Sequence, residues 1–127
     1  MSKATILVID DETSFLTIME DFLEGHGYSV LKAASGADGY RIAKSRRPDL
    51  IILDISMPLM DGGEVAQKLR ETPETKDIPV IFLTGLLSNE VEANKGHIIG
   101  GHIMFAKPCN FGELVEQIER LVCVRSS

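Results

Sequence analysis

The chain has 127 residues, of which 44% are hydrophobic and 25% are charged, as is typical of a single soluble globular domain. Its net charge of −6 argues against a nucleic-acid surface, because phosphate backbones are bound by clustered Lys and Arg side chains. No apolar run approaches the length of a membrane span and no charged-then-apolar leader is visible, so we expect a cytoplasmic protein with no membrane partner.

The first half of the chain alternates between strand-like and helix-like patterns. Its expected elements in order are a strand at 4–9, a helix from Thr13 to the glycines of "EGHG", a strand at 28–33 and a helix that runs to about Lys44. Asp10 or Asp11 could cap the first helix, although Thr13 is better placed to do so. Ser35, followed by Asp38 three residues later, resembles a capping box for the second helix.

A basic cluster follows at the expected end of the second helix. It consists of Lys44, Arg46 and Arg47. The simplest interpretation is favourable placement of positive charge against the negative end of the helix dipole.

The second half of the chain continues the alternation after Pro48, which ends any helix. Its expected elements are a strand at 50–53, a helix carrying Val65 and Leu69, a strand at 80–84, a helix at 89–98, a strand at 102–106 and a final helix that begins near Phe111. The helix at 89–98 has a sparse apolar face and contains Gly96, which costs about 1 kcal/mol relative to Ala. We expect one domain over 1–127, with short tails at 1–3 and about 123–127 and no output domain.

Five strands that alternate with five helices predict an α/β fold with a parallel sheet and helices on both faces. Binding and catalytic groups of such a sheet lie beyond the carboxyl ends of its strands. The residues at those ends are Asp10, Asp11, Asp54, Thr84 and Lys107. An aspartate after a strand is usually a turn or cap residue. Three carboxylates at neighbouring strand ends, facing a hydroxyl and a lysine, are better explained by one shared site than by separate turn and cap roles.

The chemistry of this set indicates a metal-dependent phosphoryl site. Carboxylates about 4 Å apart repel by roughly 4 kcal/mol at an effective dielectric constant near 20, so the cluster needs a cation or a proton. An all-oxygen ligand set favours a hard cation, and an incomplete one suits Mg²⁺, which keeps several waters. Lys107 and Thr84 offer the donors that phosphoryl oxygens accept. No glycine-rich nucleotide loop is present, so the phosphoryl group must come from another donor.

The motifs "VIDDE", "LDISMPLMDG", "FLTG" and "AKP", in that order, resemble the response-regulator receiver domain of two-component signalling. The resemblance covers essentially the whole chain. It implies a flavodoxin-like, doubly wound sheet of five parallel strands in the order 2-1-3-4-5. It also implies a phosphorylation-dependent switch rather than an enzyme, one that assists its own phosphorylation and dephosphorylation. Its partners would be a histidine kinase or histidine phosphotransfer protein and an unknown downstream protein.

The resemblance also assigns roles to individual residues. Asp54 would be the phosphoacceptor, and Asp10, Asp11, Asp54 and the backbone carbonyl of Ser56 would hold Mg²⁺. Thr84 and Lys107 would bind the phosphoryl group and act as the switch residues. The Lys107–Pro108 peptide bond would be cis. Phosphorylation would alter the surface around the fourth helix, fifth strand and fifth helix. The family usually carries Tyr or Phe three residues before this lysine, where this chain has Met104.

Two alternatives belong to other functional classes. One is an aspartyl-phosphate phosphatase or phosphotransferase that acts on small molecules, but its signature requires a second Asp where this chain has Ser56. The other is a flavodoxin-like cofactor binder, which would need a phosphate loop rich in Ser, Thr and Gly after the first strand. The sequence there is the acidic "DDETS".

Overall fold

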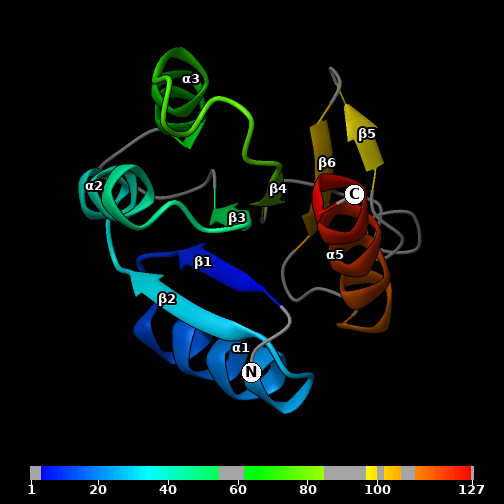
Figure 1. Cartoon of the computed structure of the whole chain (residues 1–127). Helices are drawn as coiled ribbons and strands as arrows, with labels where there is room; N and C mark the ends of the chain where they lie inside the picture. The colour runs from blue at the N-terminus through cyan, green and yellow to red at the C-terminus, as the bar shows by residue number, and fades with distance from the viewer. Residues whose placement is uncertain (1–3, 55–61, 85–96, 100–101, 107–110, 127) are drawn as a thin grey trace.

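The computed structural model describes residues 4–54, 62–84, 97–99, 102–106 and 111–126 (Figure 1). Strands and helices alternate over residues 5–84, and two further strands come before the last described helix. The strands are β1 (Thr5–Ile9), β2 (Ser29–Ala33), β3 (Leu50–Asp54), β4 (Val80–Thr84), β5 (His97–Ile99) and β6 (His102–Ala106). The helices are α1 (Thr13–Gly25), α2 (Gly36–Arg46), α3 (Gly62–Glu71) and α5 (Phe111–Ser126). The predicted α/β class is therefore confirmed.

The described strands form a six-stranded sheet in the order β2-β1-β3-β4-β6-β5. The pairs that join β2, β1, β3, β4 and β6 are parallel, whereas β5 pairs antiparallel with β6. The predicted order of the first four strands, 2-1-3-4, is confirmed. The expectation of a sheet with five strands, all parallel, is wrong at the opposite edge, where the antiparallel β5 is added.

The additional strand takes residues that were expected to end a helix at 89–98. Residues 97–98 belong to β5 instead, and 89–96 lie outside the described residues. In the sequence, Gly100 and Gly101 alone separate β5 from β6. The β-branched Ile98 and Ile99 favour an extended backbone.

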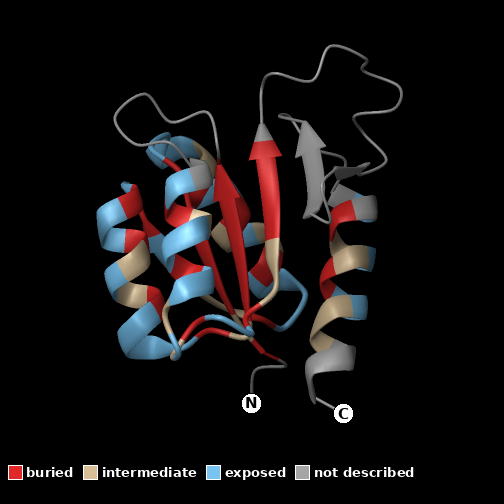
Figure 2. Cartoon of the chain, turned by 90° about the horizontal axis from the view of Figure 1, so that it is seen from above, coloured by how far each residue is buried: buried red, intermediate tan, exposed pale blue. Residues whose placement is uncertain are grey.

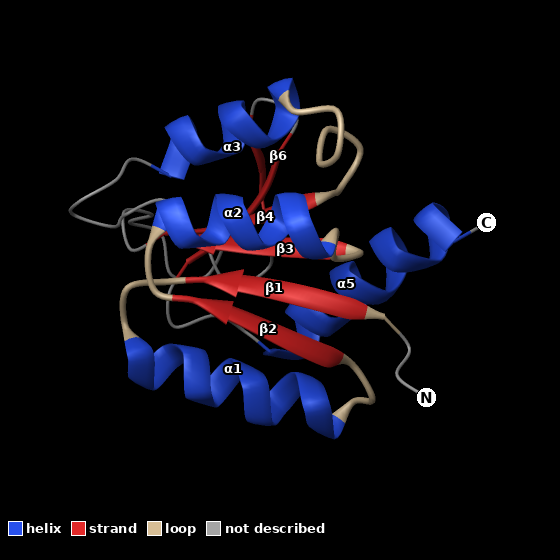
Figure 3. Cartoon of the chain, turned by 60° about the vertical axis from the view of Figure 1, so that its left-hand side comes forward, coloured by secondary structure: helices blue, strands red, loops and turns tan. Residues whose placement is uncertain are grey.

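Two hydrophobic cores hold the helices on opposite faces of the sheet (Figure 3). On one face α1 and α5 pack against alternate strand residues such as Val8 and Ile52. On the other face α2 and α3 pack against the intervening residues such as Ile9 and Leu53. The central strand β3 is therefore buried along its whole length (Figure 2). Fully burying one aliphatic side chain of β3 stabilises the fold by about 1.5–3 kcal/mol.

The helix ends differ from expectation in two places. α1 begins at Thr13 and its N-cap position is Glu12, whose side chain makes no capping hydrogen bond, so the prediction of Thr13 as the cap is wrong. α5 continues to Ser126, so the expected tail from about residue 123 is helical up to that point. The predicted cap of α2 is confirmed, because Ser35 Oγ accepts a hydrogen bond from the Asp38 N–H at 3.2 Å. No helix among the described residues is long and apolar enough to span a membrane.

Candidate metal and phosphoryl site

The sheet register brings the ends of β1 and β3 together. Ile9 of β1 pairs with Leu53 of β3. The residues that follow them, Asp10 and Asp54, therefore lie at the same level of the sheet. The backbone N–H of Asp10 also donates to the carbonyl of Ala33, which ends β2 (3.0 Å). Two aspartates are therefore fixed at the carboxyl edge of the sheet by backbone pairing rather than by a flexible loop.

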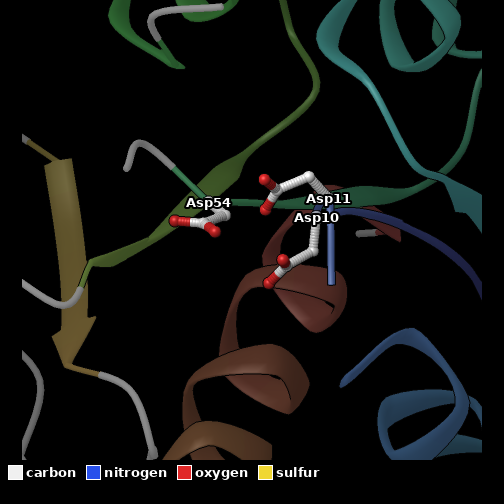
Figure 4. A group of neighbouring side chains, drawn as sticks. All are labelled: Asp10, Asp11 and Asp54. Atoms are coloured by element: carbon white, nitrogen blue, oxygen red, sulfur yellow. The ribbon is translucent and has the colours of Figure 1, made fainter. Parts of the chain in front are cut away.

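Three aspartates gather at this edge. Each of Asp10, Asp11 and Asp54 offers a carboxylate oxygen that lies within 4.8 Å of the others (Figure 4). Asp10 is fully buried and Asp54 is only 2% exposed, whereas Asp11 is exposed. The predicted acidic cluster is therefore present, with two buried members and one that faces solvent.

Asp10 also acts at the start of α1, where the sequence offered it as a possible cap. Its Oδ1 accepts a hydrogen bond from the backbone N–H of Glu12 (2.9 Å), directly before α1 begins. Helices start with backbone donors that have no partner inside the helix, and a short acidic side chain two residues upstream can satisfy one of them. This bond fixes the orientation of the Asp10 carboxylate and links the acidic cluster to the start of α1. Its sequence signal was the Asp two residues before the N-cap position.

The arrangement suits a divalent cation. Two carboxylate charges within 4.8 Å of each other repel by at least about 3.5 kcal/mol at an effective dielectric constant near 20, and a cation bound between them is attracted to both. The ligands are oxygen atoms, which fit a hard ion such as Mg²⁺. Asp11, as the exposed member, leaves a side of the cluster open to water or to a phosphoryl group.

The remaining predicted site residues are only partly described. Thr84 ends β4, and β4 pairs with β3 so that Asp54 stands opposite Leu83, the residue before Thr84. The backbone of Thr84 therefore lies beside the end of β3. Met104 lies on β6 opposite Phe82 of β4. Ser56, Lys107 and Pro108 lie outside the described residues, so their predicted roles stay predictions.

Residues 6–119 match the family model of the response regulator receiver domain. The chain belongs to this family. A receiver domain is a regulatory module, and the relatives of this chain are regulators rather than classical enzymes. Receiver membership therefore favours signalling over the alternative of a small-molecule phosphatase.

Two curated relatives illustrate the lengths in which the receiver occurs. PilH of Pseudomonas aeruginosa is 33% identical over 121 residues, which are 94% of this chain and 98% of that protein. The probable transcriptional regulator ycf27 of Porphyridium aerugineum is 38% identical over 122 residues, 96% of this chain but 49% of that protein. The chain thus spans about half the length of that regulator. The expectation of no nucleic-acid partner accordingly stays a prediction.

A solved structure bears on the metal. The receiver domain of the sensor histidine kinase PA1611 from Pseudomonas aeruginosa was determined with a magnesium ion coordinated in its active site cleft. It is 27% identical to this chain, with a TM-score of 0.78 and coverage of 94% of this chain and 97% of that one. The acidic cluster of Asp10, Asp11 and Asp54 fits a Mg²⁺ site of the same kind.

Proposed function

We propose that this receiver is a phosphorylation-dependent signalling switch in the cytoplasm and that Asp54 is its phosphoacceptor. The observation that carries the proposal is the place of Asp54. It ends a strand that is buried along its whole length, is 2% exposed, and has a carboxylate oxygen within 4.8 Å of those of Asp10 and Asp11. A carboxylate held this rigidly can be aimed at a phosphorus atom, and phosphoryl transfer depends mainly on positioning and charge neutralisation.

The donor would be a phosphohistidine of a histidine kinase or a phosphotransfer protein. A carboxylate oxygen of Asp54 attacks the phosphorus while the phosphorus–nitrogen bond breaks, and the electron pair stays with the imidazole, which takes up a proton. Water later attacks the same phosphorus, which releases inorganic phosphate and restores the carboxylate. The chain thereby assists its own phosphorylation and dephosphorylation without turning over another substrate.

Mg²⁺ would be held by Asp10, Asp11, Asp54 and the backbone carbonyl of Ser56. When bound, it neutralises the charge that gathers on the carboxylates and on the transferring phosphoryl oxygens. In this arrangement the bond from the Glu12 N–H keeps Asp10 oriented toward the cluster. Asp11, the exposed member, lies where a donor approaches from solvent.

Thr84 and Lys107 would transmit the effect of phosphorylation to the rest of the domain. The peptide bond between Lys107 and Pro108 would be cis. Phosphorylation adds a doubly charged group with three acceptor oxygens, to which a hydroxyl and an ammonium group can donate. Movement of Thr84 toward that group would alter the surface around residues 89–98, β6 and α5 for an unknown downstream protein. Met104 stands on β6 where the family usually has an aromatic residue, so a ring flip at this position is not available to the switch.

Acetyl phosphate and intact-mass spectrometry test the acceptor. With Mg²⁺ the wild type should gain one phosphoryl group and Asp54→Asn should gain none, because the amide is not a nucleophile toward phosphorus. Asp21→Asn, which removes an exposed carboxylate from α1, is the matched control and should be labelled like the wild type. Equal labelling of wild type and Asp54→Asn would show that the acceptor lies elsewhere.

A further inference from the structure

A hollow of about 550 Å³ opens between α2 and the turn that follows α3. We call it the basic hollow; it is lined by Tyr40, Arg41, Lys44, Ser45, Arg47 and Glu74. Three of these six side chains are cationic, and all three come from α2 and its C-cap. The hollow is separate from the acidic cluster, since none of its lining residues belongs to that cluster.

Positive charge is concentrated here in an otherwise acidic chain. Four of the thirteen Lys and Arg residues lie between 41 and 47, a stretch without Asp or Glu, so nine cations and nineteen acids make up the rest. Arg41 pairs with Asp38 at 3.2 Å, but both side chains are strongly exposed and such a pair contributes little. Lys44 and Arg47 are exposed, and among the described residues neither forms an ion pair.

Arg47 occupies a backbone conformation that disfavours its side chain. It is the C-cap of α2 with φ 44° and ψ 67°, in the left-handed region, and its N–H donates to the Ala43 carbonyl at 3.0 Å. Glycine adopts this conformation without a steric cost, whereas other residues pay about 1 kcal/mol. Interaction with the helix dipole explains Lys44 and Arg46 in the last turn, but it does not require an arginine at this strained position.

We propose that the basic hollow binds a short acidic segment of another protein. Lys44 and Arg47 would pair with carboxylates of that segment. Tyr40 offers a half-buried ring that is positioned by a hydrogen bond of 2.7 Å between its hydroxyl and Thr72 Oγ1, with Lys68 Nζ over the ring at 5.9 Å from its centroid. An apolar residue between the carboxylates would pack against the part of the ring that stays exposed. An aromatic surface flanked by cations suits a peptide of mixed acidic and apolar character.

An extended polyanion fits the hollow less well. Glu74 lines the same hollow, and the rest of the surface carries a large excess of acids, so DNA or an anionic membrane would be repelled beyond the few cations. A short peptide keeps its charges within the hollow and avoids that repulsion. Among anionic partners, the distribution of charge therefore favours a protein segment.

The part of the hollow formed by Lys44 and Arg47 lies toward the end of the sheet opposite the acidic cluster. α2 runs back across the sheet from the carboxyl end of β2 (Figure 3), and just beyond Arg47 the N–H of Asp49 donates to the carbonyl of Thr5, the first residue of β1 (2.8 Å). Asp10 follows the last residue of the same strand. A partner held at the hollow would leave the acidic cluster open to a phosphodonor, so docking and phosphorylation can occur together.

Fluorescence anisotropy at low ionic strength tests the proposal. The probe is a fluorescein-labelled peptide rich in glutamate with a central leucine, compared with its glutamine counterpart, a duplex DNA and phosphatidylglycerol vesicles. We expect the glutamate peptide to bind the full chain most tightly and to be released by salt. Lys44→Gln combined with Arg47→Gly should weaken binding about three- to tenfold, while Arg120→Gln on α5 should leave it unchanged.

Two further variants make the test specific. Arg47→Gly relieves the left-handed strain, so loss of binding in the double variant cannot be attributed to unfolding. Glu74→Gln should tighten binding about two- to fivefold, whereas the exposed Glu71→Gln, which changes the net charge equally, should not. The proposal is overturned if the glutamine peptide binds equally well, if Arg120→Gln weakens binding as much as the double variant, or if DNA or vesicles bind more tightly than the peptide.

Discussion

Gly39 allows α2 to lie against β1 directly before the acidic cluster, and Gly39→Ala should therefore destabilise the domain. A Cβ at this helical position would stand 2.7 Å from Ile9 Cγ1 and still closer to Ile9 Cδ1. Ile9 is fully buried and packed in the core between β1 and α2, so its side chain has little room to move.

The size of the effect follows from two opposing contributions. Overpacking of a filled core costs about 1–3 kcal/mol, while alanine is favoured over glycine inside a helix by about 1 kcal/mol. We expect the free energy of unfolding of Gly39→Ala to fall by about 1–2 kcal/mol. Urea denaturation followed by circular dichroism, without Mg²⁺, measures it.

Gly25 is the matched control, because it also lies in a helix but a Cβ there would meet nothing within 4 Å. Gly25→Ala should therefore leave stability unchanged or raise it by up to about 1 kcal/mol. Ile9→Ala removes the atoms that the added methyl group would strike, so it should be less costly in the Gly39→Ala background than in the wild type. If the two substitutions add to within about 0.5 kcal/mol, the contact between them is not the cause and the reasoning is refuted.

Three other changes have defined outcomes. Asp11→Ala should weaken Mg²⁺ binding in calorimetry, while stability without metal holds or rises because one repelling carboxylate is gone; a large loss without metal would contradict this. Burial, and secondarily the charge of Glu119, raises the pKa of Tyr28, so the folded state holds this proton more tightly than the unfolded state. Stability of the wild type should fall above about pH 10 more steeply than that of Tyr28→Phe, and parallel pH profiles would exclude this contribution. Ser35→Ala should cost about 1 kcal/mol of unfolding free energy, whereas the nearby exposed Ser45→Ala should cost less than half of that.

The sequence predicted the order of strands and helices because apolar residues follow a pattern that depends on which faces of an element are buried. The run of 50–53 is apolar at every position, which indicates a strand covered on both faces, and β3 is buried throughout. The rule that sites lie at the carboxyl ends of parallel strands then predicts Asp10, Asp11 and Asp54 at one edge of the sheet. Among the described residues, the helix expected at 89–98 is wrong at 97–98, which belong to β5, because a strand of three residues is too short for a period to distinguish strand from helix.

Tertiary structure alone decided the features that depend on distances between segments remote in the sequence. The carboxylates could be placed at one edge from their positions in the chain, but their approach to within 4.8 Å depends on the register of Ile9 against Leu53. No periodic pattern in the sequence predicts the contact of Gly39 with Ile9. None predicts that Glu74 lines the same hollow as the cations of α2. Patterns along a chain report which side of an element is buried, whereas the partner that buries it is selected by the packing of the whole fold.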